Sequence, residues 1–151
     1  MPQSERLADI VESITIKAPM TTIFAALTEP EQVVQWQGSE DSYRVIEMNS
    51  DLRVGGAWET IGLTSSGGRR CAKGVYRVVD PPRCLEMTFS HDFAGPEAPM
   101  HETMVRYDLV ELDGMTNVTI THSGVTNKYE REGMAEAWGA ILGWLAAWAK
   151  R

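Results

Sequence analysis

Hydrophobic and polar positions in the first forty residues change from a strand pattern to a helical one. Residues 10–17 alternate between apolar and polar side chains, which predicts a β-strand. Pro19 ends this strand, because proline has no backbone N–H to offer a central ladder. Apolar residues then recur at helical spacing in residues 20–27 and 28–37, so we expect two short helices after the first strand.

The middle of the chain consists of short segments rich in β-branched and aromatic residues, separated by turn-forming residues. The connections are too short to hold a helix between neighbouring strands, so they favour antiparallel hairpins. The six strands predicted for this region are residues 43–48, 57–63, 74–79, 84–91, 103–112 and 116–123.

The register of one hairpin follows from its turn. Asp113-Gly114 is typical of a two-residue type I′ turn. Such a turn pairs Tyr107 with Ile120 and Val105 with His122. The apolar residues of both strands then share one face, and we expect His122 to lie on that inner face.

The two cysteines, Cys71 and Cys84, lie on the two strands of another predicted hairpin. A tight turn at residues 80–83 pairs Val79 with Cys84 and puts Cys71 opposite Asp92, far along the ladder. A disulfide needs Cα atoms within about 7 Å, so we predict none between these residues. Their spacing also fits no metal motif.

Residues 127–151 form the one long helical pattern. An apolar stripe runs along it and consists of Met134, Trp138, Ile141, Leu142, Leu145 and Trp148. No charged residue occurs between positions 137 and 149, and a helix without a polar face is usually covered on both sides. We therefore predict a homodimer contact through the opposite face, which carries Gly139, Ala140, Gly143 and Ala147. The alternative is a face of small residues that is simply exposed.

Composition narrows the classes of function. A chain of 151 residues suits one domain spanning 1–151, and a formal net charge of −7 argues against nucleic acid and anionic membranes as partners. No apolar run reaches the roughly 18 residues that a membrane span needs. The first nine residues lack the apolar segment of a secretory signal, so we expect a cytoplasmic protein.

Positions 51–60 read DLRVGGAWET, with two adjacent glycines between predicted strands. The stretch lacks the lysine of a phosphate loop, and a strand follows it rather than the helix of a dinucleotide site. We interpret Gly55-Gly56 as a bend or bulge between strands, where Asp51 can bond backbone amides of the turn and Arg53 can pair with Asp51 or with a neighbouring carboxylate. The alternative is that Arg53 anchors a ligand.

Several motifs together are typical of one superfamily: IKAP at 16–19, ALTEPEQVVQW at 26–36, DLRVGGAW at 51–58, and GVYRVVDPPRCLEMTF at 74–89. With the tryptophan-bearing terminal helix, the chain resembles the START-like (SRPBCC, Bet v 1-like) superfamily, and within it the bacterial branch related to the activator of Hsp90 ATPase. The resemblance implies an α+β helix-grip fold. A curved seven-stranded antiparallel sheet would surround the long C-terminal helix, and the two short helices would close one end.

The resemblance also implies a cavity between the sheet and the C-terminal helix. Candidate residues for its lining are Trp36, Arg53, Trp58, Met87, Phe89, His91, Tyr107, His122, Trp138 and Leu142. We expect no metal and no cofactor, because the histidines and cysteines lack the spacing of metal ligands.

The function expected from this cavity is the binding of a small hydrophobic or amphipathic ligand. One alternative is an enzyme of the polyketide cyclase or hydrolase type, which needs an acid–base group such as His91 or His122 beside the ligand. Another is a co-chaperone-like domain that binds proteins, which predicts an exposed apolar patch and a filled interior.

Overall fold

A computed structural model describes residues 7–39, 41–93, 95 and 101–150. The elements, in chain order, are β1 Ile10–Ile16, α1 Met20–Thr28, α2 Pro30–Trp36, β2 Arg44–Ser50, β3 Ala57–Leu63, β4 Arg69–Asp80, β5 Cys84–His91, β6 Thr103–Leu112, β7 Met115–Ser123 and α3 Lys128–Ala149. This order confirms the predicted succession of one strand, two short helices, six strands and a long helix.

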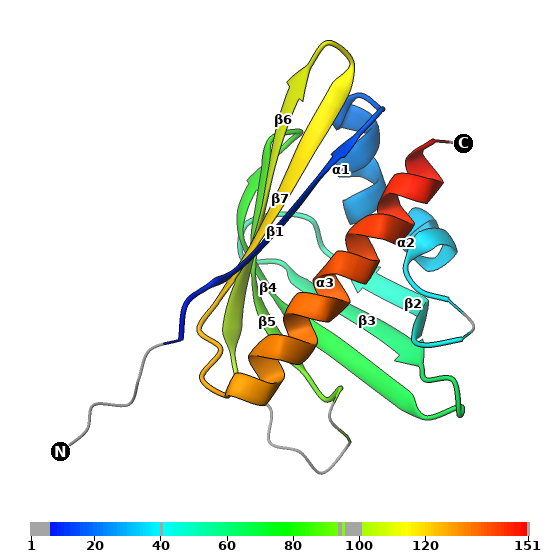
Figure 1. Ribbon diagram of the computed structural model, residues 1–151, viewed down its shortest axis with the longest axis vertical. Coiled ribbons are helices and arrows are strands. Elements are labelled where there is room, and N and C mark those ends of the chain that lie inside the picture. Colours follow the sequence, from blue (N-terminus) through cyan, green and yellow to red (C-terminus); the bar gives the residue numbers. More distant parts are fainter. Residues whose placement is uncertain (1–6, 40, 94, 96–100, 151) are drawn as a thin grey trace, which may run out of the picture.

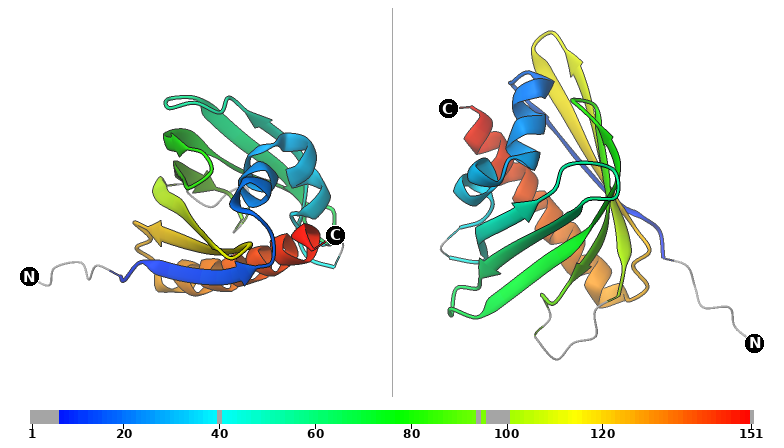
Figure 2. Two further views of the ribbon diagram at one scale, coloured as in Figure 1. Left: turned by 90° about the horizontal axis from the view of Figure 1, so that it is seen from above. Right: turned by 180° about the vertical axis from the view of Figure 1, so that it is seen from behind.

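The seven strands form one antiparallel sheet in the order β1-β7-β6-β5-β4-β3-β2. Six of the strands follow one another as neighbours, whereas β1 pairs with β7 at the opposite edge from β2. Between β1 and β2, the chain crosses from one edge to the other through α1 and α2. The sheet curls, and α3 lies across its concave side with α1 and α2 beside it (Figures 1 and 2). The α+β helix-grip fold is therefore confirmed.

The predicted register of the β6–β7 hairpin is confirmed. Asp113 and Gly114 have φ values of 54° and 76°, as a type I′ turn requires. Tyr107 of β6 pairs with Ile120 of β7, and Val105 of β6 pairs with His122 of β7. The side chain of His122 points inward, and only 1% of the residue is exposed.

The predicted register of the β4–β5 hairpin is correct at its far end and wrong at its turn. The Asp92 amide donates to the Cys71 carbonyl at 3.2 Å, as the prediction requires. At the turn, however, Cys84 pairs with Asp80 rather than with Val79. The register shifts by one residue between Tyr76 and Val78, because a bulge adds a residue to β4. Both thiols are free.

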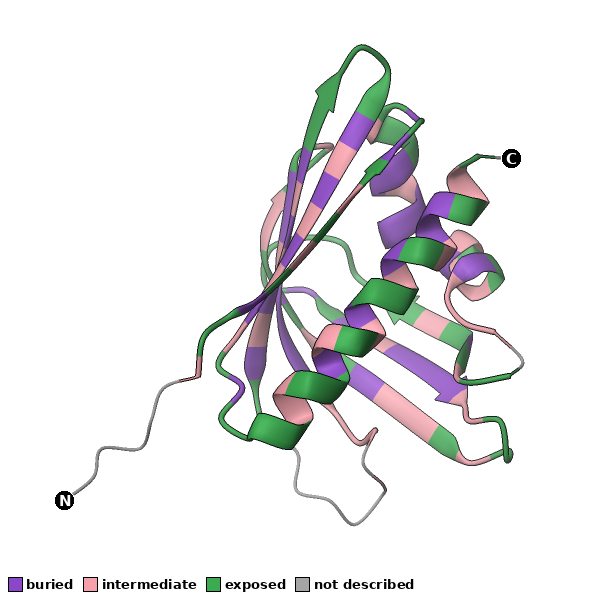
Figure 3. Ribbon diagram, viewed as in Figure 1, coloured by how far each residue is buried: buried purple, intermediate pink, exposed green. Residues whose placement is uncertain are grey.

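The core lies between the concave face of the sheet and the helices. Buried positions alternate with less buried ones along β6 and β7 (Figure 3). Met134, Trp138, Leu142 and Leu145 form the buried stripe of α3, while Ile141 and Trp148 are only half-buried. The opposite face of α3, with Gly139, Ala140, Gly143 and Ala147, is exposed. The homodimer contact through these four residues stays a prediction.

The glycine pair of DLRVGGAW joins β2 to β3 and fastens the connection to β4. Gly55, at φ 86°, donates its amide to the Tyr76 carbonyl, and the Tyr76 amide donates to the Gly56 carbonyl. A Cβ atom at position 56 would overlap the backbone carbonyl oxygen of Asp51. The Arg53 guanidinium pairs with the Asp51 carboxylate at 2.8 Å. The interpretation of this segment as a structural bend is confirmed.

Replacement of Gly56 by alanine tests this close approach. The added methyl group meets backbone rather than a movable side chain, so we expect Gly56→Ala to lower the free energy of unfolding by more than about 1 kcal/mol. The control is Gly133→Ala, at an exposed position in α3 where a Cβ meets nothing within 4 Å. That change should raise stability by roughly 0.5–1 kcal/mol. Urea unfolding measures both, and equal effects would contradict the account.

Candidate ligand-binding pocket

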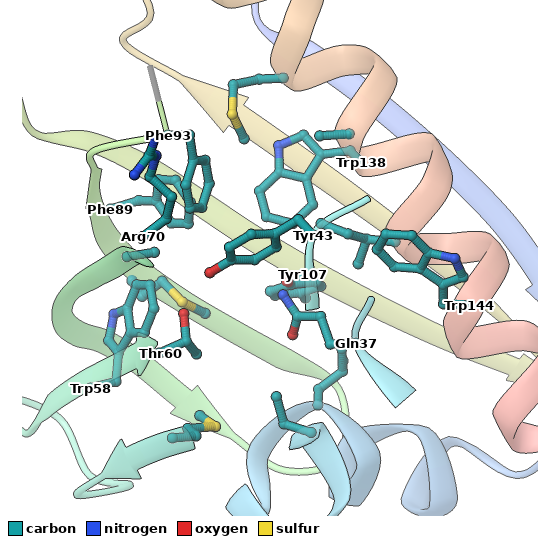
Figure 4. Close-up of a pocket in the computed structure, with 18 of the residues that line it drawn as sticks. Gln37, Tyr43, Trp58, Thr60, Arg70, Phe89, Phe93, Tyr107, Trp138 and Trp144 are labelled. Carbon is teal, nitrogen blue, oxygen red and sulfur yellow. The ribbon is translucent and has the colours of Figure 1, made fainter. Parts of the chain in front are cut away.

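A pocket of about 290 Å³ lies between α3 and the part of the sheet formed by β2 to β5, with Tyr107 of β6 at its inner side. It exists because α3 does not cover the sheet evenly. The helix packs mainly against β1 at one edge and against α1 and α2. The middle strands therefore face side chains of α3 across a gap rather than in close backbone contact. Side chains from both sides line that gap (Figure 4).

The inner wall of the pocket is apolar and largely aromatic. Trp58, Phe89, Tyr107 and Trp138 are all buried and surround the space with Met87. Their rings contact one another: the centroids of Phe89 and Trp138 are 5.9 Å apart, and those of Tyr107 and Trp138 are 6.2 Å apart at an edge-on angle. Such contacts fix the orientation of each ring and make a preformed apolar wall.

Trp58 is held in the wall by its polar edge. Its indole N–H donates to the carbonyl of Thr88 on β5, at 3.2 Å, although Trp58 itself is on β3. Gly74 of β4 lies directly opposite Trp58 in the register. A Cβ atom at Gly74 would overlap the Thr88 carbonyl, so the absence of a side chain there lets β5 approach and the indole reach across β4.

His122 connects α3 to the sheet immediately behind the aromatic wall. The Trp138 indole donates its N–H to His122 Nδ1 at 3.0 Å, so this nitrogen must be unprotonated. The imidazole proton is then on Nε2, which lies 2.8 Å from the Thr103 hydroxyl. That hydroxyl in turn donates to the Phe89 carbonyl at 3.0 Å. Every polar group in this chain of hydrogen bonds is satisfied only while the imidazole is neutral.

Burial lowers the pKa of His122 to about 4, and the charges of His91 and His101 act in the same direction. The ring is therefore uncharged at neutral pH. Its two nitrogens are committed to Trp138 and Thr103, which leaves no free lone pair for acid–base chemistry. His122 positions the wall of the pocket instead of facing it.

His91 is also turned away from the pocket. Its Nδ1 accepts the Phe93 amide at 3.1 Å, and its Nε2 lies 3.3 Å from a carboxylate oxygen of Glu130 on α3. Burial lowers the pKa of His91, although the Glu130 carboxylate opposes the shift. The exposed ring of His101 lies 3.7 Å from the other oxygen of Glu130. Both histidines therefore contact the start of α3 through the Glu130 carboxylate.

The rim of the pocket is more polar than its wall. Its residues are half-buried: Gln37, Tyr43, Thr64, Arg70, Phe93, Ile141 and Trp144. Figure 4 shows the Tyr43 hydroxyl pointing toward the side where Arg70 and Thr60 lie, away from Trp144. The site therefore combines an apolar interior with a polar group at one part of its opening.

Five of the ten residues predicted for the lining are in it: Trp58, Met87, Phe89, Tyr107 and Trp138. Two others are buried outside the lining. The Trp36 indole donates to the Ala26 carbonyl at 2.8 Å, and Leu142 lies in the core one helical turn after Trp138. Ile141, one position earlier, lines the pocket in its place.

The remaining predicted residues do not reach the pocket. Arg53 is outside the lining: its side chain is 70% exposed and paired with Asp51, as the structural alternative for this residue expected. His91 and His122 face Glu130 and Trp138 respectively. None of the seven rim residues was among the ten predicted for the lining, and those missed include Tyr43, Arg70 and Trp144.

Two further classes of site can be assessed in the described part of the chain. None of its helices is long and apolar enough to cross a membrane. Among residues 7–39, 41–93, 95 and 101–150, no three histidine, cysteine, aspartate or glutamate side chains are grouped to hold a metal ion.

An antiparallel sheet curled around a long terminal helix, with a pocket between the two, defines a helix-grip protein. The family model described as activator of Hsp90 ATPase homolog 1-like protein matches residues 17–150. The chain therefore belongs to the activator of Hsp90 ATPase homolog 1-like family, as its motifs predicted. Among curated proteins, none matches the chain significantly.

Solved structures with the same fold span almost the whole chain. Protein CV1439 from Chromobacterium violaceum has a TM-score of 0.79 at 20% identity, covering 96% of this chain and 99% of its own. Protein NE0264 from Nitrosomonas europaea has a TM-score of 0.77 at 22% identity, covering 94% of each chain. DynU16, from the dynemicin biosynthetic locus, has a TM-score of 0.73 at 19% identity, covering 99% of this chain and 48% of its own. At these identities the likeness establishes the fold.

The neutral state of His122 makes stability depend on pH. The unfolded chain takes up a proton on this residue below about pH 6.5, whereas the folded chain resists until about pH 4. The stabilisation is therefore complete above pH 6.5 and disappears as the pH falls to 4. The shift corresponds to about 3 kcal/mol. We expect the difference in unfolding free energy between the wild type and His122→Gln to shrink by about this amount across that window.

Denaturant unfolding at several pH values measures this difference. The titration of all other groups is common to the two proteins, so it cancels when their unfolding free energies are subtracted. A difference that stays constant from pH 7 to pH 4 would contradict the proposed hydrogen-bond chain. Nitrogen NMR of the imidazole gives a second readout, with the proton expected on Nε2 of His122 at neutral pH.

Proposed function

We propose that this protein binds a small hydrophobic or amphipathic molecule in the pocket between α3 and strands β2 to β5. The observation that carries the proposal is the enclosed aromatic wall. Trp58, Phe89 and Trp138 are each at most 6% exposed, yet they surround about 290 Å³ of space. Protein interiors are normally close-packed, so a space of this size with ordered aromatic walls is typical of a binding site.

The dimensions of the pocket limit the ligand. Small-molecule sites usually measure roughly 300–1,000 Å³, so this pocket is at the lower end of the range. A compact ring system fits better than a long, branched molecule. The gain on binding comes mainly from apolar surface removed from water, at roughly 25 cal/mol per Å².

The family supports a binding role without defining the ligand. One structural neighbour, DynU16, belongs to the dynemicin biosynthetic locus. Helix-grip proteins have varied activities, so the fold alone does not choose between a carrier and an enzyme. The enzyme alternative relied on His91 or His122 beside the ligand, and both side chains are committed elsewhere. The binding role therefore has the stronger support.

A pocket-filling variant tests the proposal. Ala137 of α3 lines the pocket, so the ring introduced by Ala137→Phe would occupy ligand space. We expect the wild type to bind N-phenyl-1-naphthylamine, an uncharged fluorescent ring compound, at one saturable site. The variant should bind it at least about tenfold more weakly, because the ligand can no longer bury its surface. Fluorescence titration measures both affinities.

The matched control is Ala140→Phe, which adds the same ring to the exposed face of the same helix. Its affinity for the probe should equal that of the wild type. Absence of saturable binding to the wild type, or equal weakening by both substitutions, would reject the pocket as the binding site.

A further inference from the structure

We propose that the pocket selects an amphipathic acid: a compact apolar ring system that carries one anionic oxygen group. The ring system would lie against the aromatic wall, and the anionic group would lie at the rim between Arg70 and Tyr43. This inference rests on the proposed binding function and adds the chemical class of the ligand.

Arg70 gives the rim its charge. Of the described residues that line the pocket, Arg70 alone carries a charge at neutral pH, and none is a carboxylate. Its Nη1 donates to the Arg69 carbonyl at 2.8 Å, but its Nε is shut off from solvent without a hydrogen-bond partner. A buried guanidinium N–H normally has an acceptor, so this donor is available for an oxygen of the ligand.

Tyr43 provides a second donor at the same place. Its hydroxyl is also shut off from solvent, and the Thr60 hydroxyl acts on it as a hydrogen-bond donor, which leaves the phenol proton itself without an acceptor. Burial raises the pKa of Tyr43 to about 12, with smaller contributions from Cys71 and Asp92 and an opposing one from the nearby Thr60 hydroxyl. The hydroxyl therefore keeps its proton at neutral pH and can donate it to an anion.

The sheet register brings the two donors together. Gly62 of β3 pairs with Arg70 of β4, and paired residues of an antiparallel ladder share one face. The Tyr43 ring lies over Gly62, where a Cβ atom would overlap the ring and its hydroxyl. Tyr43 and Arg70 thus occupy neighbouring positions on the inner face, at the edge of the apolar wall. Asp92 is held by the Cys71 amide at 2.8 Å and is not part of the lining.

Two matched fluorescent probes test the inference. 1-Anilinonaphthalene-8-sulfonate has the ring system of N-phenyl-1-naphthylamine with one added sulfonate. We expect Arg70→Met, which keeps an apolar stem but removes the charge, to weaken binding of the sulfonate probe at least about tenfold. Binding of the uncharged probe should weaken at least about fivefold less than binding of the sulfonate probe, because only the sulfonate loses an ionic partner. Tyr43→Phe should weaken binding of the sulfonate probe by roughly threefold to tenfold.

The control is Arg77→Met, because Arg77 is exposed on the same strand and its loss changes the net charge equally. It should leave both affinities unchanged. The inference is overturned if Arg70→Met weakens both probes equally, weakens neither, or is matched by Arg77→Met, while binding of the uncharged probe still supports the proposed function. If the wild type binds neither probe, the proposed function itself fails.

Discussion

The hydrogen-bond chain from Trp138 through His122 and Thr103 is the interaction on which the pocket depends. It joins α3 to the sheet at the point where the aromatic wall begins, and it fixes the orientation of the Trp138 ring. Because α3 also lies along β1, the helix is held toward one edge of the sheet. The strands on the other side are left facing a space rather than a helix backbone. The neutral imidazole of His122 thus has a structural role, which is to link Trp138 of α3 to Thr103 of β6, rather than the acid–base role that histidine often has.

The wall and the rim of the pocket differ in chemistry. Aromatic rings that contact one another supply apolar surface, and their polar edges are satisfied by backbone carbonyls or by His122. Among the described residues, the buried side-chain donors that lack an acceptor are at the rim, on Tyr43 and Arg70. Unsatisfied buried donors cost free energy, so their position at the opening of an apolar pocket indicates where a ligand compensates for them. The membership of the chain in its family is compatible with this arrangement but does not require it.

The fold was predictable from the sequence to a greater extent than the site. Alternation of apolar residues and the turn at Asp113-Gly114 fixed the β6–β7 register, and hence the inward direction of His122. The bulge in β4 was not predictable, because one inserted residue leaves no compositional signal. Arg53 and Arg70 illustrate the same limit: Arg53 lies in the connection between β2 and β3 with its side chain exposed, whereas Arg70 lies on β4 and lines the pocket. The predicted strand began at residue 74, whereas β4 begins at Arg69, so the pair of Gly62 and Arg70 lay outside the predicted ladder.

Isotope-filtered NMR of the protein with bound N-phenyl-1-naphthylamine tests the central claim most directly. The account predicts cross-peaks from ligand protons to the methyl groups of Ala72, Ala137 and Ile141, which line the space between the sheet and α3. Cross-peaks confined to Ala140 and Ala147, on the exposed face of the same helix, would place the ligand outside the pocket and contradict the account.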